Sequence, residues 1–164
     1  MSSDEGAARL THVDADGRAR QVDVGRKPVT ERTAEAAGFV RASAAAIAAI
    51  RAGRVKKGDP LQVARIAGIQ AAKRTWELVP LCHPIPLTHV DVEVTVADDG
   101  IAIRASARAR FHTGVEMEAL TAVAVAGLTV YDMLKAIDKT MVIEDVRLIK
   151  KTGGQSGDVH SGGG

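Results

Sequence analysis

The sequence has little of several residue types, and each scarcity excludes a class of protein. Its one cysteine, Cys82, excludes an internal disulfide framework and any metal site built from several cysteines, and it is typical of a reducing compartment. Aromatic residues are limited to two Phe, one Tyr and one Trp, so the base-stacking surface of single-stranded nucleic-acid binders is missing. The 22 Lys and Arg residues nearly balance the 20 Asp and Glu residues, so no overall field attracts the chain to nucleic acid or membranes.

Long hydrophobic stretches are also scarce. The longest apolar run, residues 119–130, contains Thr121, Gly127 and Thr129 and is shorter than a bilayer-spanning helix requires. The first residues are polar and acidic, unlike a secretory signal. We therefore expect a cytoplasmic protein. Its 164 residues predict one domain with a core of Ala, Val, Ile and Leu.

What the sequence does contain is a mixture of strand-like and helix-like apolar patterns. Alternation over residues 90–96 and 101–109 predicts two strands, joined by a two-residue turn at Asp99-Gly100. That turn places Val96 opposite Ile103, so apolar side chains share one face of the hairpin.

Helical spacing predicts three longer helices. The first is expected from Thr30, as its N-cap, to Gly53. The second is an almost wholly apolar helix that begins at Asp59-Pro60 and must end before Pro80. The third covers residues 115–137 and is expected to be buried on most sides.

Two further strands are expected at residues 20–24 and 141–149. Strands and helices in this mixture predict an α+β fold, a two-layer sandwich in which an antiparallel sheet packs against helices. The single domain is expected to cover residues 11–158. It would lie between a disordered N-terminal segment, residues 1–10, and a flexible C-terminal tail, residues 159–164.

Two glutamates, Glu116 and Glu118, flank Met117 in the first turn of the third expected helix. Carboxylates in this position can compensate the helix dipole, a contribution of a few tenths to about 1 kcal/mol. Two carboxylates directly after Thr113-Gly114, where the preceding strand is expected to end, are more than capping of the helix requires. Both a capping role and a binding role therefore stay open.

Asp132 lies near the other end of the same helix. At about 100° per residue it shares a face with Val125 and Thr129, so we expect it to face the protein. A carboxylate there needs a partner or a functional role. Lys135, three residues on, offers a plain ion pair, and a site role is the alternative.

The length of this helix constrains any shared site. Glu118 and Asp132 are about 21 Å apart along the axis at ~1.5 Å per residue, so no small substrate touches both. If both belong to one site, two copies of the chain must supply them about a two-fold axis, where the ends of antiparallel helices meet. Otherwise only one of them is functional.

Cys82 and His83 lie on a loop bounded by prolines. Neighbours on an extended loop point to opposite sides, which disfavours a Cys–His nucleophile pair. His83, His89 and His112 are not spaced as zinc ligands on one element. His83 is better suited to be an acid/base group or a hydrogen-bond donor to phosphate.

Basic residues beside helix ends or glycines are candidates for binding phosphate groups. Lys57 precedes a helix N-terminus, and Lys73 and Arg74 lie late in that helix. Lys150 and Lys151 precede a glycine-rich segment, whose glycines are too irregular for a P-loop.

Three blocks of the sequence carry a family resemblance: KKGDPLQVARIAGIQAAKRTWELVPLCHPIPL, TGVEMEALTAVAVAGLTVYDMLKAIDK and VRLIKKTGGQSGD. From about Leu10 to Asp158 the chain resembles the cyclic pyranopterin monophosphate synthases, the molybdenum cofactor biosynthesis protein C family. The resemblance implies a ferredoxin-like subunit in a hexamer, a trimer of dimers, with sites at the dimer interfaces. It implies conversion of 3′,8-cyclo-7,8-dihydro-GTP to cyclic pyranopterin monophosphate with release of pyrophosphate. We expect this chemistry to need no metal or redox cofactor.

The resemblance also implies roles for individual residues. The catalytic residues are the Lys of the KGD turn, the Asp of YDM and the Lys one turn later, which are Lys57, Asp132 and Lys135. The substrate-binding residues are Leu81, Cys82, His83, Glu116, Met117, Glu118 and Lys151. From their position late in the second helix we add Lys73 and Arg74 as further phosphate ligands.

On these roles we hypothesise acid/base catalysis by Lys57 and Lys135, with Asp132 holding Lys135. A lysine becomes a usable acid or base near neutral pH when nearby cations or burial depress its pKa. Two other functions stay open on the residues alone. One is a nucleotide-binding oligomer without chemistry, and the other is a cofactor-free enzyme acting on a different phosphorylated heterocycle.

Overall fold

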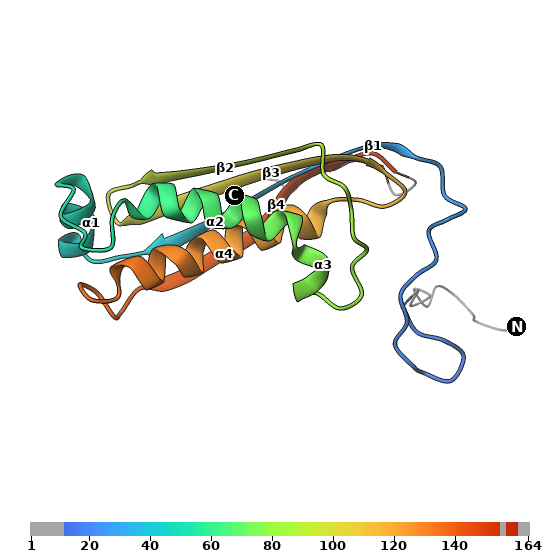
Figure 1. The fold of residues 1–164 in the computed structure, drawn as a ribbon, viewed down its shortest axis with the longest axis horizontal. Helices are drawn as coiled ribbons and strands as arrows, with labels where there is room; N and C mark the ends of the chain where they lie inside the picture. The colour runs from blue at the N-terminus through green and yellow to red at the C-terminus, as the bar shows by residue number, and fades with distance from the viewer. Residues whose placement is uncertain (1–11, 155–156, 161–164) are drawn as a thin grey trace, which may run out of the picture.

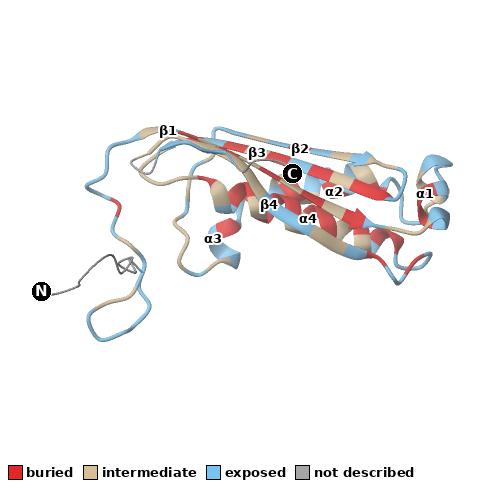
Figure 2. Ribbon diagram, turned by 180° about the vertical axis from the view of Figure 1, so that it is seen from behind, coloured by how far each residue is buried: buried red, intermediate tan, exposed pale blue. Residues whose placement is uncertain are grey.

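The computed structural model of the chain describes residues 12–154 and 157–160. Within these ranges an antiparallel sheet carries the helices α2 and α4 on one face (Figures 1 and 2). The elements are β1 (Thr30–Arg41), α1 (Ala44–Arg51), α2 (Pro60–Lys73), α3 (Thr75–Leu78), β2 (His89–Val96), β3 (Gly100–Phe111), α4 (Glu116–Leu134), β4 (Val142–Thr152) and β5 (Val159–His160). The segment 1–10, expected to be disordered, lies outside the described residues.

The topology is that of a ferredoxin-like fold. The strands follow the order β2-β3-β1-β4-β5, and helices connect β1 to β2 and β3 to β4, which gives the β-α-β-β-α-β arrangement. This confirms the predicted two-layer α+β sandwich. β5 adds a short edge strand, in which Val159 and His160 pair with Lys151 and Lys150. The sheet therefore continues two residues beyond the domain boundary expected at residue 158.

Small side chains let the two layers approach closely. The helix-facing positions of β1 include Ala34 and Ala36, and α4 packs on them through alanines such as Ala122 and Ala126, all of them buried. A Cβ on Gly68 of α2 would lie 2.9 Å from the Ala122 carbonyl oxygen, so α2 can pack this close to α4 only with glycine at that position.

The helix expected from Thr30 to Gly53 is wrong over its first half. Residues Thr30–Arg41 form the central strand β1, paired with β3 on one side and β4 on the other. Pairing along both edges outweighs the helix propensity of its alanines. Only Ala44–Arg51 is helical, and Ser43 rather than Thr30 caps it by accepting a hydrogen bond from the Ala46 N–H.

The strand expected at residues 20–24 is also absent. The structure has no strand there, and an isolated bridge between Val13 and Ala19 lies just before it. Residues 20–24 instead run beside the loop that carries His83, as described below. The Val22 carbonyl oxygen bonds to the His83 side chain, and the Gln21 side chain bonds to the Cys82 carbonyl oxygen.

The hairpin forms, but its register differs from the expected one by two residues. Its turn is Asp98-Asp99, and Val96 faces Ile101 rather than Ile103. A shift of two residues keeps every side chain on its expected face. Gly100 is not a turn residue but a buried strand residue, because a Cβ there would collide with the backbone of β1.

The two long helices are close to their predicted bounds. α2 begins as expected, with Asp59 accepting hydrogen bonds from the Leu61 and Gln62 N–H groups. Among the described residues, α4 is the one helix long and apolar enough to cross a membrane by length and composition. Half of its apolar window is buried, and it packs on α2 and the sheet as the core helix of the fold.

Candidate functional site

Most of the residues expected to form the site lie in two groups, one at each end of α4. The substrate-binding group surrounds the N-terminus of α4, and the catalytic group surrounds its C-terminus. The helix spaces Glu118 and Asp132 about 21 Å apart along its axis. A single chain therefore does not bring the two groups together.

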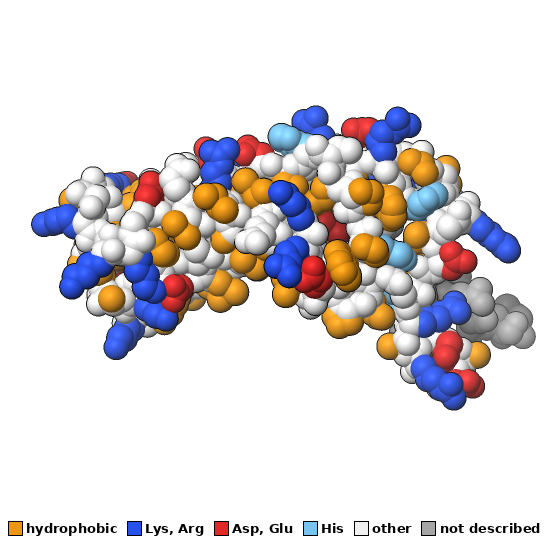
Figure 3. Space-filling model, viewed as in Figure 1, with side chains coloured by type: hydrophobic (Ala, Val, Ile, Leu, Met, Phe, Trp, Pro, Cys, Tyr) orange, Lys and Arg blue, Asp and Glu red, His pale blue; other side chains and the backbone are white. Residues whose placement is uncertain are grey.

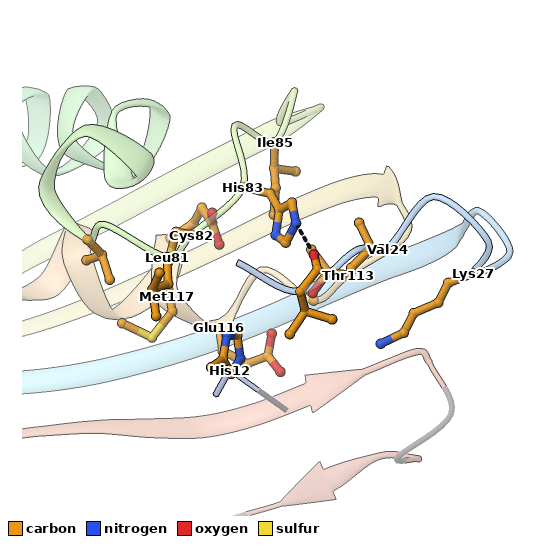
Figure 4. A pocket seen from close by; sticks show the side chains of 14 residues that line it. His12, Val24, Lys27, Leu81, Cys82, His83, Ile85, Thr113, Glu116 and Met117 are labelled. Carbon is orange, nitrogen blue, oxygen red and sulfur yellow. Dashed lines mark hydrogen bonds between the residues drawn. The ribbon is translucent and has the colours of Figure 1, made fainter. Parts of the chain in front are cut away.

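The first group lines a cavity of about 480 Å³, here called the main cavity (Figure 4). The loop before β2 contributes one wall and the first turn of α4 another, while residues 22–27 of the N-terminal segment close a side. Six predicted substrate-binding residues line it: Leu81, Cys82, His83, Glu116, Met117 and Glu118.

His83 is held in a defined tautomer. Its Nε2 lies 2.8 Å from the Val22 carbonyl oxygen, which can only accept, so Nε2 carries the hydrogen. In the neutral ring, Nδ1 is then left as an acceptor. Gln21 donates to the Cys82 carbonyl oxygen at 3.0 Å. These two bonds fix the N-terminal segment against the cavity wall, a contact that the sequence alone did not suggest.

Glu118 is the buried carboxyl of the main cavity, with 3% of its surface exposed. Burial raises its pKa to about 7, and the negative charge of Glu116 adds to the shift. A carboxyl that titrates near neutral pH can both give and take a proton. The pKa of the Cys82 thiol is also raised, by burial and by Glu118, which disfavours a thiolate nucleophile.

Glu116 forms an ion pair with Lys151 of β4, so its role is not limited to the N-terminus of α4. Its carboxylate lies 2.6 Å from Lys151 Nζ, and both side chains are mostly covered. The pair joins α4 to β4 at the boundary between the main cavity and a second one.

This second cavity, of about 520 Å³, is here called the basic cavity. It shares Lys27 and Glu116 with the main cavity, and Lys27 points toward Glu116 in Figure 4. Four of its lining side chains carry or can gain a positive charge: Lys27, Arg32, His112 and Lys151. Among the described residues that line it, Glu116 is the one acidic residue.

Arg32 is the most deeply placed of these cations, with 7% exposure. Its Nε donates to the Phe111 carbonyl oxygen at 3.2 Å and its Nη2 to that of His112 at 3.1 Å. Within the described ranges no carboxylate lies within ion-pair distance of it. A buried guanidinium held by carbonyls alone favours an anion in the adjoining space.

Lys27, Arg32 and His112 were not predicted from the sequence as cavity residues. Arg32 was hidden by the helix expected over β1, and Lys27 lies in a loop without motif. A signal was present in TERTAEA, where Glu31 and Glu35 alternate with Arg32 and Ala34 at the period of a strand.

The second group, here called the Lys–Asp cluster, consists of Lys57, Asp132 and Lys135. Lys57 Nζ lies 2.8 Å from Asp132 Oδ2 and 2.9 Å from the Asp132 carbonyl oxygen, and Lys135 Nζ lies 2.7 Å from Oδ1. The predicted ion pair between Asp132 and Lys135 is thus confirmed. The expectation that Asp132 faces the protein is wrong for a single chain, because its side chain is 55% exposed.

Charge pairing sets the protonation of the Lys–Asp cluster. Hydrogen bonds from Lys135 and Lys57 lower the pKa of Asp132 to about 2, and Asp132 raises the pKa of Lys135. In one chain, therefore, Lys135 is held protonated. A depressed lysine pKa, as hypothesised from the sequence, requires groups beyond those of a single chain.

Lys73 and Arg74 lie apart from both cavities. Lys73 lines a separate crevice with Ile69 and His89, and Arg74 is paired with Glu77 at 2.8 Å. In the part of the chain that the structure describes, no three His, Cys, Asp or Glu side chains group to hold a metal ion.

Comparisons with known proteins agree with one another. A family model described as the MoaC family matches residues 21–154. The chain is 52% identical over 155 residues to the cyclic pyranopterin monophosphate synthase of Brevibacillus brevis, covering 94% of this chain and 97% of that protein. It is 57% identical over 150 residues to the protein of the same name from Streptomyces griseus, with 92% and 85% covered. It is 53% identical over 154 residues to molybdenum cofactor biosynthesis protein 1 of Homo sapiens, covering 93% of this chain and 24% of that protein.

Proposed function

The chain belongs to the MoaC family, and on that premise we propose that it converts 3′,8-cyclo-7,8-dihydro-GTP to cyclic pyranopterin monophosphate and pyrophosphate. The reaction is a step in the biosynthesis of the molybdenum cofactor. One observation of the structure carries the proposal: residues of the three sequence blocks line a cavity that holds the buried carboxyl of Glu118 and form the Lys–Asp cluster, and a basic cavity adjoins the first. These are the kinds of group that the reaction requires.

The reaction needs both charge stabilisation and proton transfer. A sugar hydroxyl attacks the α-phosphorus of the triphosphate, the bond to the β-phosphate oxygen breaks, and pyrophosphate leaves with the bonding electrons. The hydroxyl proton must be removed, and negative charge grows on the departing oxygens. Rebuilding the purine-derived ring as a pterin requires further proton transfers to and from ring nitrogens and carbons.

The basic cavity is suited to the triphosphate. Lys27, Arg32 and Lys151 would neutralise the phosphate oxygens, and the buried Arg32 offers a forked donor in a fixed orientation. Donors placed before the reaction stabilise the departing pyrophosphate most. This assignment keeps Lys151 as a phosphate ligand and replaces Lys73 and Arg74 with residues that share its cavity.

The main cavity and the Lys–Asp cluster are suited to the ring. His83, Glu116 and Glu118 would orient the base and sugar, and the carboxyl of Glu118 can exchange a proton near neutral pH. Lys135, held protonated by Asp132, would act as an acid, and Lys57 would supply or remove the second proton.

Both groups reach one substrate only if two copies of the chain combine. At about 100° per residue, Met117, Ala124, Leu128, Asp132 and Lys135 share one face of α4. Packing this face against its copy in an antiparallel direction would bring the main cavity of one chain to the Lys–Asp cluster of the other. We therefore propose a two-fold dimer with two shared sites, within the hexamer expected from the resemblance.

Exposed apolar side chains on the helix layer support this arrangement (Figure 3). Leu128 of α4 is 59% exposed, and Ile66 of α2 is 64% exposed, although the apolar sequence of α2 is typical of a buried helix. The buried residues of α2 are instead small ones such as Ala64 and Gly68. Large apolar residues that point outward across a helix layer are typical of a surface covered by a partner.

Turnover of the cyclised GTP substrate tests the function directly. We expect the protein to release pyrophosphate and form the pterin product, measured by phosphate analysis and fluorescence. Lys57→Ala and Asp132→Asn are each expected to lower turnover by more than about 100-fold, the scale of acid/base catalysis. Lys56→Ala, one residue from Lys57, is the matched control and should be active. Substrate binding without turnover in the unaltered protein would contradict the proposal.

A mixing experiment tests the shared site. Glu118→Gln disables the α4 N-terminal half-site and Asp132→Asn the C-terminal half-site. A mixed dimer then holds one site with two intact halves, so exchange of the two inactive proteins should restore roughly a quarter of the unaltered activity. Mixing Lys57→Ala with Asp132→Asn is the control and should restore nothing, because those residues share one half-site. Equal failure of both mixtures would contradict the two-copy arrangement.

The location is proposed as cytoplasmic. The single cysteine is unpaired and lines the main cavity, where an oxidising environment would modify it.

A further inference from the structure

Thr30 stands out as a hydroxyl without a partner. Among the described residues, Thr30 Oγ1 is the one buried side-chain nitrogen or oxygen that makes no hydrogen bond. Buried polar groups are almost always hydrogen-bonded, so an exception in a native structure requires a reason. The sheet does not account for the unbonded hydroxyl, because the strand pairing of β1 uses only main-chain groups.

Its position supplies a reason. Thr30 is the first residue of β1 and lies opposite Phe111 of β3. Side chains two residues apart on a strand share a face, so Thr30 points to the same side as Arg32. Both residues line the basic cavity, together with Lys27 and Lys151. The unpartnered hydroxyl therefore belongs to the wall that carries the uncompensated guanidinium.

We propose that Thr30 is a binding residue for the polyphosphate end of the substrate, and that a phosphate oxygen is the missing partner of its hydroxyl. This inference rests on the proposed function for the identity of the substrate. The phosphate oxygen accepts the hydroxyl hydrogen, while Arg32 and Lys151 neutralise the charge.

The hydroxyl can reach the ligand without disturbing the protein. In the free chain it is turned away from solvent, but no hydrogen bond holds it there. Rotation about the Cα–Cβ bond exchanges the hydroxyl with the methyl group between staggered positions. When the phosphate binds, the hydroxyl gains a hydrogen bond and gives up none. Most polar groups, in contrast, must give up a bond to water or protein before they bond to a ligand.

The replacement Thr30→Val tests this inference, because valine keeps the shape and removes only the hydroxyl. The probe is inorganic pyrophosphate, with its affinity measured by calorimetry on the full chain, beside KM and kcat for the cyclised GTP. We expect about a tenfold weaker affinity for pyrophosphate and a higher KM, as loss of one hydrogen bond to a charged group predicts. The urea midpoint should be unchanged or raised, since an unsatisfied buried group is removed.

Two further variants make the result specific. Thr30→Ser keeps a hydroxyl and should retain the affinity for pyrophosphate. Thr33→Val is the matched control on the same strand: its hydroxyl lies 2.5 Å from that of Thr152, on the opposite face of the sheet. It should lower the urea midpoint and leave the affinity unchanged.

If Thr30→Val binds pyrophosphate as tightly as the unaltered protein, the inference is overturned. If the affinity is unchanged and the urea midpoint is lowered, the hydroxyl contributes to folding instead. The proposed function fails separately, through absence of turnover in the unaltered protein. The pyrophosphate measurement would still decide the role of Thr30 in that case.

Discussion

At the scale of single residues, Glu118 shows most clearly how burial sets chemistry. A carboxyl with 3% exposure and a like charge nearby binds its proton more tightly than one in water, which is why its pKa reaches about 7. The same residue could be picked out from the sequence only as one of two acidic residues in a helix turn. Burial distinguished it from Glu116, which pairs with Lys151.

The raised pKa of Glu118 has a consequence for stability. Between its ordinary value near 4.5 and about 7, the folded state holds a proton that the unfolded chain has released. The free energy of unfolding therefore falls as pH rises through this window. Glu118→Gln removes the effect. The free energy of unfolding of the variant, relative to that of the unaltered protein, should therefore rise by about 1–3 kcal/mol from pH 5 to pH 8.

Urea unfolding at the two pH values measures this gain. Glu93→Gln, an exposed position on β2, is the control and should differ from the unaltered protein equally at both values. A pH-independent difference for Glu118→Gln would show that the carboxyl titrates normally.

At the scale of elements, the sequence predicted those with local signals. α2 has its Asp-Pro start and α4 its Thr-Gly break, and both were placed within a few residues. β1 was misread because its alanines favour a helix, and its strand form depends on two neighbours distant in the sequence. The register of the hairpin depended on a contact between Gly100 and β1 that no local pattern contains.

The predicted site followed the same rule. Residues in contiguous motifs, such as the Leu81–His83 loop and the Glu116–Glu118 turn, were found together in the main cavity. The basic cavity was missed because its cations come from four separate segments. These are Lys27 before β1, Arg32 in β1, His112 just after β3 and Lys151 in β4. Its cations are adjacent only after the sheet has formed.

The turn after β4 offers a prediction about that cavity. Gly154 has a φ of +93°, and a Cβ there would collide with Arg32 Nη1. Gly154→Ala should displace the guanidinium and lower the affinity for pyrophosphate by about tenfold, the scale of one charged hydrogen bond. Calorimetry with pyrophosphate measures the loss.

Gly157→Ala is the matched control for this substitution. Its φ of +70° imposes a similar backbone strain, but a Cβ there meets open space. It should therefore keep the affinity for pyrophosphate. An equal loss in both variants would attribute the effect to the backbone of the turn rather than to Arg32.

At the scale of the whole molecule, α4 would separate the two halves of the proposed shared site. Its outward face carries Leu128 between Met117 and Asp132, about one turn before Asp132. Leu128→Glu places a charge within the proposed contact, near its middle, while the single chain should be little affected because the residue is already exposed. We expect dissociation of the dimer and more than about a tenfold loss of turnover, the effect of disrupting a central contact.

Sedimentation equilibrium and turnover measure this outcome together. Ala48→Glu, an exposed position on α1, is the control and should alter neither. A Leu128→Glu protein that remains associated and active would place the contact between copies elsewhere.

The spacing along α4 also has a genetic consequence. When each pocket takes one half from either chain, a copy altered at Glu118 alone or Asp132 alone still leaves one pocket intact beside a normal copy. A copy carrying both changes spoils the two pockets at once, since each then contains one damaged half. Such an allele should be dominant over a normal one, although each change by itself is tolerated in the heterozygous state.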